Sequence, residues 1–562
     1  MADFLTDPRF VRFAENVLTR GLGGIAGKLE NGPGFVGEDF DAAGDFYSGS
    51  STFLSAPAEN ARWRLGYAVA DLTPADWRTH DYFLGGYLTA ENGFNNRVND
   101  VIDKMQCRII ALDDGSGRGV SLFATVDCIG LGNRHIKAIR RHLADLMKYE
   151  GVKETLCAVN VFSTHAHSCV DTQGLWTDTL KKLRHNYKKN RTGRGVYWDG
   201  ADPEFMRALV RHVAGGMLGA LRDLKPGKLT YAEKDVGVQY FSNRNRPSAT
   251  ALGTRLIRFV FTPDEKTAVP TVIASFPAHP DTAGLPTRDG QGTGRELCGE
   301  YIYYMGELIN GAGYNFMFIN GAICAIYMNR GPSNDGVTLS RRYEQSVRYG
   351  REMAKITLAM TKTAEEIEAD PLLYDIGNVT ADMAQSAANG VPYTLWYENW
   401  QPVPEIPVPP LLNLRLAQVT IPVTNPLIIL VGKLNLVAYD VIAKKDGGYA
   451  ITTEIGYLEL GGVFRAVLVP GEFCQDLLWG GDSLSAAGAW HGADFPYPAL
   501  IKAFGGDLHA FGLANDAIGY IVPDNDYILG DFKNHYHELI SLGAAAGSTV
   551  VKGLMELKEG LL

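Results

Sequence analysis

The chain alternates between short apolar runs and longer stretches with helical periodicity, and this alternation most constrains the fold. Residues 107–113 and 120–127 are apolar runs of strand length, separated by a turn-forming segment. Residues 133–147 then repeat apolar side chains at helical spacing, and 159–167 return to an apolar, β-branched run. Side chains alternate with period two in a strand and recur with period 3.6 in a helix. This part therefore predicts the order strand, strand, helix, strand.

The same alternation continues through most of the chain. Further strands are predicted at 65–74, 256–261, 271–276, 315–319 and 463–469, and helices at 203–224 and 300–310. Strands that alternate with helices indicate an α/β architecture. We expect mixed β-sheets flanked by helices. A chain of 562 residues favours roughly three domains by length, but a single large α/β catalytic domain with long loops is also compatible with it.

The N-terminal region differs from this pattern. Residues 8–29 have apolar positions at helical spacing, which predicts an amphipathic helix that docks on the body or on a membrane surface. Its mixed charges favour docking on the body. Gly- and Ser-rich sequence follows to about residue 55 and predicts irregular loop. We divide the chain into an N-terminal extension, 1–60, and a main domain, 61–562.

The charge balance limits the partners. The net charge is −10 and the sequence pI is about 5.7, which argues against nucleic acid, because binding of the phosphate backbone needs clustered cations. One basic stretch, 181–194, is the exception. A solvated loop is the favoured interpretation, and a patch for anionic head groups or an acidic substrate is the alternative.

Cysteine usage and hydropathy indicate in which cellular compartment the protein is expected. The seven cysteines are odd in number and contain no Cys-x-x-Cys pair, which predicts free thiols in a reducing, cytoplasmic compartment. The N-terminus lacks the pattern of a secretory signal. The most apolar window, 426–439, is too short and too polar to span a bilayer. Residues 421–431 predict core packing, or an apolar wall able to receive a lipid tail.

Two histidines stand one residue apart at the end of the apolar run 159–167. If the run is a strand, His165 and His167 point to the same face. Two such imidazoles can share a metal ion, or give it one ligand and its reaction one proton shuttle. A polar strand terminus is the alternative for this motif taken alone.

Other candidate ligands also follow predicted strands. His279 comes after the run 271–276, and Glu472 after the run 463–469. Loops that follow strand ends are where sites of α/β proteins assemble. A zinc hydrolase needs three or four nitrogen or oxygen ligands that converge in space but not in sequence. These positions therefore offer such a set.

Four motifs in this order resemble those of the neutral (non-lysosomal) ceramidases, which are zinc-dependent amidases that cleave the N-acyl bond of ceramide. They are Ser163–Ser168 (STHAHS), Phe276–Pro280 (FPAHP), Val469–Phe473 (VPGEF) and Gly512–Tyr520 (GLANDAIGY). The resemblance covers the chain from about Trp63 onward. It implies a ceramidase-like catalytic domain with a bound Zn²⁺ and a small-molecule or lipid-like substrate.

The resemblance also implies roles for single residues. The zinc ligands would be His165, His279, Glu472 and Tyr520, with His167 as the proton shuttle and Tyr520 also stabilising the oxyanion. Two neutral imidazoles and one carboxylate leave zinc a net positive charge, which lowers the pKa of its water to about 7. Arg244 or Arg246 would bind the substrate, and a surface loop is the alternative for this segment.

The sequence also departs from the family. Tyr327 stands where the family has a serine beside the scissile amide, and a bulky phenol cannot simply replace a small hydroxyl. We place Tyr327 among the catalytic residues and expect a changed substrate or mechanism. The family's C-terminal β-sandwich domain and bacterial secretion signal are expected to be absent. Hydrolysis of an ester, lactone or cyclic amide stays open, as do a non-catalytic binding role and peripheral membrane contact, and the sequence defines no oligomeric state.

Overall fold

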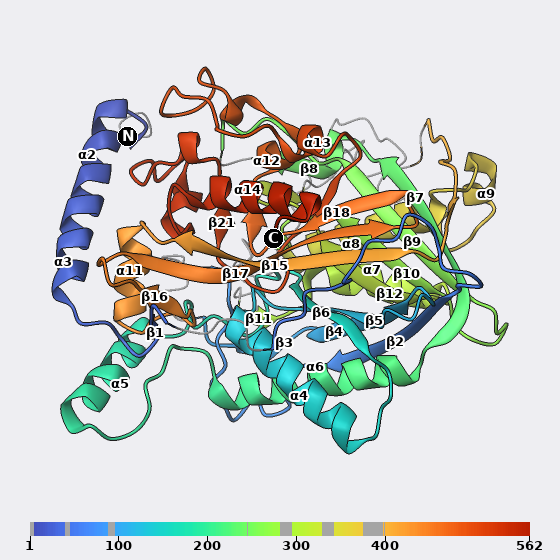
Figure 1. The fold of residues 1–562 in the computed structure, drawn as a ribbon, viewed down its shortest axis with the longest axis horizontal. Coiled ribbons are helices and arrows are strands. Elements are labelled where there is room, and N and C mark those ends of the chain that lie inside the picture. The colour runs from blue at the N-terminus through green and yellow to red at the C-terminus, as the bar shows by residue number, and fades with distance from the viewer. Residues whose placement is uncertain are drawn as a thin grey trace.

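The computed structural model describes residues 5–39, 45–87, 96–243, 246–281, 295–328, 342–374, 397 and 399–562. Within these residues, two β-sheets lie face to face, with helices on both outer faces (Figure 1). The layers therefore run helix, sheet, sheet, helix. This confirms the α/β class with mixed sheets flanked by helices.

The larger sheet has nine strands in the described part of the chain. Its order is β12-β10-β9-β7-β2-β4-β5-β6, with β14 paired to β7. Most neighbours are antiparallel, but β5–β6 and β10–β12 are parallel. The strands are β2 Trp63–Asp71, β4 Gln106–Asp113, β5 Val120–Val126, β6 Leu156–Ser163, β7 Lys225–Asp235, β9 Arg255–Pro263, β10 Thr271–Phe276, β12 Asn315–Asn320 and β14 Ile406–Val408.

The smaller sheet has six strands among the described residues, in the order β1-β16-β17-β18-β20 with β15 paired to β17. Short two-stranded pairs, β19–β21, β13–β8 and β3–β11, form beside the two sheets. The strands of the smaller sheet are β1 Phe35–Gly37, β15 Leu412–Pro422, β16 Val441–Ala443, β17 Tyr449–Leu460, β18 Phe464–Leu468 and β20 His509–Phe511. The short pairs comprise β19 Glu472–Phe473 and β21 Tyr520–Ile521, β13 Ile326–Met328 and β8 Phe241–Asn243, and β3 Asp100–Val101 and β11 Glu296–Leu297.

Helices cover the outer faces of both sheets. On the larger sheet lie α4 Asn133–Tyr149, α6 Pro203–Arg222, α7 Glu300–Gly311 and α8 Arg342–Ala359, and on the smaller sheet lies α14 Ala546–Glu559. The parallel pairs arise because α4 connects β5 to β6 and α7 connects β10 to β12. The other helices are α2 Pro8–Val17, α3 Gly23–Lys28, α5 Thr179–Thr192, α9 Ala364–Glu368, α11 Pro426–Lys433, α12 Gln475–Trp479 and α13 Leu500–Ala503.

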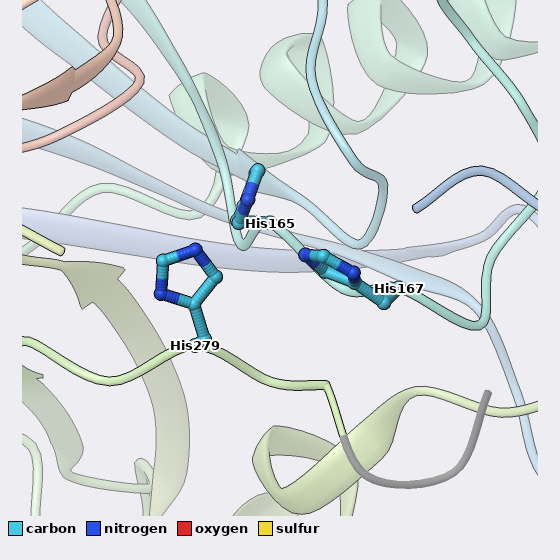
Figure 2. Close-up of side chains that lie close together, drawn as sticks. All are labelled: His165, His167 and His279. Carbon is cyan, nitrogen blue, oxygen red and sulfur yellow. The ribbon is translucent and has the colours of Figure 1, made fainter. Parts of the chain in front are cut away.

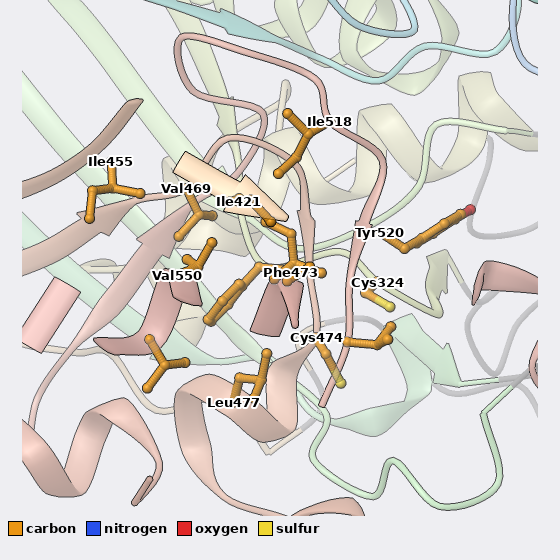
Figure 3. Packing of buried hydrophobic residues seen from close by; sticks show 14 of the residues in the cluster. Cys324, Ile421, Ile455, Val469, Phe473, Cys474, Leu477, Ile518, Tyr520 and Val550 are labelled. Atoms are coloured by element: carbon orange, nitrogen blue, oxygen red, sulfur yellow. The ribbon is translucent and has the colours of Figure 1, made fainter. Parts of the chain in front are cut away.

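One apolar core lies between the two sheets. Phe162 of the larger sheet and Phe511 of the smaller one meet there edge to face, with ring centroids 6.2 Å apart. A second core lies between the smaller sheet and α14, and includes Ile421, Phe473 and Val550 (Figure 3). Strand β5 is buried along its whole length because both faces of its sheet are covered. Ile421 thus confirms the core packing predicted for its segment.

Three predictions about local structure were wrong in part. Strand β6 ends at Ser163 and does not reach His167, because His165 has a φ of 67°. The basic stretch predicted to be a loop is mostly helix α5. The N-terminal loop contributes β1, which pairs with β16 of the smaller sheet. The N-terminal helix itself is confirmed, as α2 and α3 with a π-helical turn, Leu18–Leu22, between them.

The boundary at residue 60 stays a prediction. None of the helices in the described ranges combines the length and the hydropathy needed to cross a membrane. All seven cysteines are buried and free, as expected for thiols that form no disulfide framework.

Candidate metal centre

Three histidines from two chain segments converge in space (Figure 2). His165 and His167 follow β6, and His279 follows β10. One side-chain nitrogen from each lies within 4.8 Å of the others. Residues that follow predicted strands were the candidates for such a set, and the structure places these three histidines together.

The last residue of β12, Asn320, holds the two histidine segments together. Its Nδ2 donates to the carbonyl oxygens of Thr164 at 2.9 Å and Ala278 at 3.3 Å. These carbonyls belong to the residues that directly precede His165 and His279. One buried side chain therefore sets the spacing of both histidines.

His165 and His279 are oriented in the same way. The Nδ1 of His165 donates to the carbonyl of Ile129 at 2.7 Å, and the Nδ1 of His279 donates to that of Ile326, also at 2.7 Å. A carbonyl oxygen can only accept, so Nδ1 carries the proton in both rings. In the neutral imidazole this leaves a lone pair on Nε2. Metal-binding histidines are typically fixed by such a bond from the other nitrogen.

Both Nε2 atoms face the same carboxylate oxygen. Oε2 of Glu472 lies 2.9 Å from Nε2 of His279 and 3.3 Å from Nε2 of His165. Three atoms with lone pairs converge here, and each of these side chains is at most 6% exposed. Lone pairs at such distances repel unless a proton or a metal cation lies between them. The donor set, two imidazoles and a carboxylate, is one that zinc binds.

The electrostatics of Glu472 and His279 are coupled. Burial favours the neutral carboxyl of Glu472, but the charges and hydrogen bonds of His165 and His279 outweigh it and lower its pKa. Burial likewise opposes charge on His279, and its hydrogen bond to Glu472 outweighs that effect and raises the pKa of His279. The carboxylate therefore attracts positive charge to this point, whether a proton or a metal ion supplies it.

His167 differs from the other two histidines. It is half-buried, and its ring meets that of His165 at 83°, with centroids 4.8 Å apart. The ring also lies 4.9 Å from that of Tyr87. Burial and the neighbouring His165 and His279 hold the pKa of His167 well below its usual value, so it is neutral at pH 7.

Gly86 allows His167 this position. A Cβ at Gly86 would come within 2.7 Å of three atoms of the His167 side chain, and the glycine has a φ of +124°. Both facts require glycine here. Sequence reasoning missed Gly86 and Tyr87, since a single glycine in a loop carries no signal of what it approaches.

Tyr520 lies next to Glu472 on a neighbouring strand. Strands β19 and β21 are parallel, and Glu472 and Tyr520 are direct partners in their register. Tyr520 is 6% exposed, and its hydroxyl points away from Phe473 and Leu477 of the core (Figure 3). Burial and the charge of Glu472 raise the pKa of Tyr520 well above its usual value, so the phenol keeps its proton.

Tyr327 packs directly on one of the histidines. Its ring stacks on that of His279, with centroids 4.7 Å apart and planes at 23°. Its hydroxyl is hydrogen-bonded to that of Tyr536. Tyr327 thus lies at the candidate metal centre and is linked to a second phenol.

His537 is a further buried histidine beside these residues. Its ring stacks on Tyr536, at 4.1 Å between centroids, and meets Tyr520 edge to face at 4.5 Å. Burial, then the charge of Arg246, lowers its pKa well below the usual value. Among the described residues, neither ring nitrogen of His537 has a hydrogen-bond partner. The sequence analysis missed Tyr536 and His537, although His535-Tyr536-His537 is a second His-x-His.

The two arginines of the predicted substrate segment have different outcomes. Arg244 lies outside the described residues. Arg246 is 1% exposed, and its guanidinium pairs with Asp526 and Glu538. Both terminal nitrogens are thus used within the protein, next to His537. The substrate contact of Arg246 stays a prediction.

Backbone strain gathers around this centre. His165, Ala325, Leu513 and Asn515 all have φ between 49° and 67°. Non-glycine residues in this region cost about 1–3 kcal/mol each and persist only where surrounding structure enforces them. Such residues are frequent at functional sites, which agrees with the placement of the histidines.

Sequence and structure comparisons give different results. No protein-family profile and no curated protein sequence matches the chain. In structure, the chain is similar to the neutral ceramidase from Pseudomonas aeruginosa, with a TM-score of 0.56 and 14% identity over 89% of this chain and 75% of that chain. It is also similar to a ceramidase complexed with C2, with a TM-score of 0.55 and 13% identity over 89% and 76% of the two chains. The chain therefore shares the fold of these ceramidases.

Proposed function

We propose that the protein is a zinc-dependent hydrolase that cleaves an amide bond of an N-acylated, partly apolar substrate. One observation carries this proposal. The Nε2 atoms of His165 and His279 converge on one oxygen of Glu472, and both rings are fixed by bonds from Nδ1 to carbonyls. The shared fold with two ceramidase structures supports amide hydrolysis as the reaction.

The zinc ligands in this proposal are His165, His279, Glu472 and Tyr520. A zinc ion held there supplies a Lewis acid and a bound water of lowered pKa. The register of β19 and β21 supports Tyr520 as the fourth member, since it places this residue beside Glu472. A set with His167 in place of Tyr520 is the alternative, because the nitrogen of His167 also lies within 4.8 Å of the other two histidines.

His167 is proposed to move the proton. Its lowered pKa keeps it neutral at pH 7, so it can accept a proton and pass it to the leaving amine. Tyr520 keeps its own proton because of burial and the charge of Glu472. It can therefore donate a hydrogen bond to the oxygen on which negative charge develops.

The position of Tyr327 favours a second candidate reaction. The phenol covers one face of His279 and is bonded to Tyr536. The resemblance expects a small serine at this position, and the structure has a rigid aromatic ring there. A compact ester, lactone or cyclic amide needs less room than ceramide does. The same ligands and the same proton donor would serve that reaction.

The test combines metal analysis with a substrate panel. Purified protein should contain zinc, and His165→Ala should lose both zinc and hydrolysis of N-acyl amides. His212→Ala, at an exposed histidine of α6, is the matched control and should keep both. Short-chain esters and lactones, assayed beside the amides, separate the two reactions.

Three outcomes would reject the proposal in different ways. Absence of zinc, or unchanged hydrolysis by His165→Ala, refutes the metal-dependent mechanism. Faster cleavage of esters or lactones than of amides refutes the amide substrate only. Zinc retained without turnover of any substrate indicates a binding protein.

A further inference from the structure

Helix α5 carries its apolar side chains toward solvent. Leu180 is 79% exposed, Tyr187 67% and Leu183 36%, and these positions share one face at about 100° per residue. The buried residues of the helix are Lys182 and Asn186. A helix that packs on a globular body normally buries its apolar face. In α5 this arrangement is inverted.

Polar contacts hold α5 to the body. Lys182 Nζ donates to the carbonyls of Gly174 and, at 3.4 Å, Leu436. Asn186 Nδ2 donates to the carbonyl of Asn435 at 3.3 Å. Polar side chains, Lys182 and Asn186, therefore anchor the helix through buried carbonyl acceptors. The apolar face is left without a partner in the described part of the protein.

Cations lie beside this apolar face. Lys181, Arg184, Lys188 and Arg191 are exposed and fall within about 100° of Leu180 around the helix. The helix contains no acidic residue, although the chain carries a net charge of −10. Within the described ranges, none of the four cations forms an ion pair with a carboxylate. The positive charge of α5 is thus concentrated and unneutralised.

Exposed apolar side chains also occur in the next loop and on the N-terminal helices. Val196 after α5 is 75% exposed, and Phe13, Val17 and Ile25 of α2 and α3 are 65%, 54% and 53% exposed. Helices α3 and α5 attach to the same short segment, 433–436. Lys433 donates to carbonyls at the end of α3, and the carbonyls of Asn435 and Leu436 accept from α5. In Figure 1 the two helices lie at the same end of the molecule.

We propose that this end of the molecule docks on an anionic lipid bilayer. The docking surface comprises the exposed apolar and basic residues of α5 with Phe13, Val17 and Ile25. Helices that lie in a membrane interface combine an apolar face with flanking Lys and Arg, which match hydrocarbon and anionic head groups. Nucleic acid would use the cations alone and would leave Leu180, Leu183 and Val196 in water.

The position of α5 in the chain connects this surface to the candidate metal centre. The segment Ser168–Asp178 leads directly from His167 into α5. Within it, Asp171 accepts bonds from the backbone of Gln173, Gly174, Trp176 and Thr177, which makes the connection rigid. Docking would therefore orient the metal centre relative to the bilayer. The binding itself does not depend on the proposed hydrolysis.

The test measures co-sedimentation of the full chain with vesicles. Equimolar phosphatidylcholine and phosphatidylglycerol should bind the protein, pure phosphatidylcholine should not, and added salt should weaken binding. Each cation near an anionic surface strengthens binding about fivefold. The variant Lys181→Glu/Arg184→Glu/Lys188→Glu should thus bind at least about 100-fold more weakly, and Leu183→Ser/Tyr187→Ser should also bind less.

The matched control reverses three exposed cations elsewhere. Lys148→Glu/Arg211→Glu/Lys228→Glu makes the same change in net charge on α4, α6 and β7 and should leave vesicle binding nearly unchanged. Equal loss in this control, or equal binding to neutral and anionic vesicles, overturns the proposal. Binding of duplex DNA without vesicle binding overturns it too. Unchanged zinc content in the α5 variants separates this test from that of the metal centre.

Discussion

Replacing Glu472 by glutamine tests the convergence of lone pairs directly. Glutamine keeps the size of the side chain and removes only its charge. In the structure, Oε2 of Glu472 is 2.9 Å from Nε2 of His279 and 3.3 Å from Nε2 of His165. Unit charges at such distances interact by about 5 kcal/mol at an effective dielectric constant of 20. A divalent ion bound among these atoms would gain at least as much from the carboxylate.

Desolvation offsets part of that energy. Loss of one partner of a buried charge pair costs about 3–5 kcal/mol, which corresponds to an increase of about 10²–10⁴-fold in a dissociation constant. We therefore expect Glu472→Gln to bind zinc at least 100-fold more weakly than the wild type.

The assay is competition for zinc with a chromophoric chelator at pH 7.5, followed by metal analysis after dialysis. Glu405→Gln is the control, because Glu405 is partly exposed and its ion pair with Arg258 lies in another part of the fold. Thermal unfolding of the metal-free variants shows whether the fold is kept. A variant Glu472→Gln that folds and binds zinc as tightly as the wild type would refute the proposed ligand set.

Three further predictions concern single residues. His167→Gln should lower kcat about 10²–10⁴-fold with zinc content unchanged. Loss of zinc from this variant would instead make His167 a ligand. Gly86→Ala, which displaces the His167 ring, should also lower kcat. Tyr327→Phe should cost about 1 kcal/mol in urea unfolding through the lost bond to Tyr536, and Tyr327→Ser should raise hydrolysis of N-acyl amides if the phenol excludes them. Burial raises the pKa of the Asp516 carboxyl from 3.8 to about 7, so its contribution to stability is present below the pKa of the unfolded state and is lost as pH rises through 7. The free energy of unfolding of the wild type should therefore fall by up to about 4 kcal/mol between pH 4 and pH 8. Asp516→Asn should flatten this pH dependence in urea unfolding.

The strands of the core could be predicted from sequence because their side-chain pattern reflects burial. The run at 271–276 coincides with β10, and the apolar runs at 107–113 and 120–127 contain most of β4 and β5. Burial on both faces produces continuous apolar runs, which few other structures produce. The order of strands within the sheets was not predictable, because pairing joins residues far apart in the chain.

The basic stretch shows how a high density of charge can hide a helix whose apolar residues have helical spacing. Leu180, Leu183 and Tyr187 have helical spacing, and Asp178 caps the helix by accepting from the backbone of Lys181. The density of cations nevertheless favoured a loop. A helix is normally expected to bury its apolar face in its own protein. That assumption fails for α5, and the failure is itself the observation on which the docking surface rests.

The candidate metal centre was predictable only in part, because some of its residues come from distant segments of the chain. His165, His279 and Glu472 follow apolar runs and could be identified at strand ends. Tyr536 and His537 come from a short 3-10 helix, Tyr536–Ile540, that follows Tyr520 in the chain, and only the tertiary fold brings them to the site. Short motifs record which residues follow a strand, but they do not record which distant loops cover it.

The backbone at His165 changes how the first His-x-His must be understood. A continuous strand would place His165 and His167 side by side on one face, with equivalent surroundings. The left-handed conformation of His165, at φ 67°, ends the strand and turns the two rings to 83°. His165 then faces Glu472, whereas His167 lies against Gly86 and Tyr87 and stays half-buried. Strain at one residue thus gives adjacent histidines different environments, which is what different roles in one reaction require.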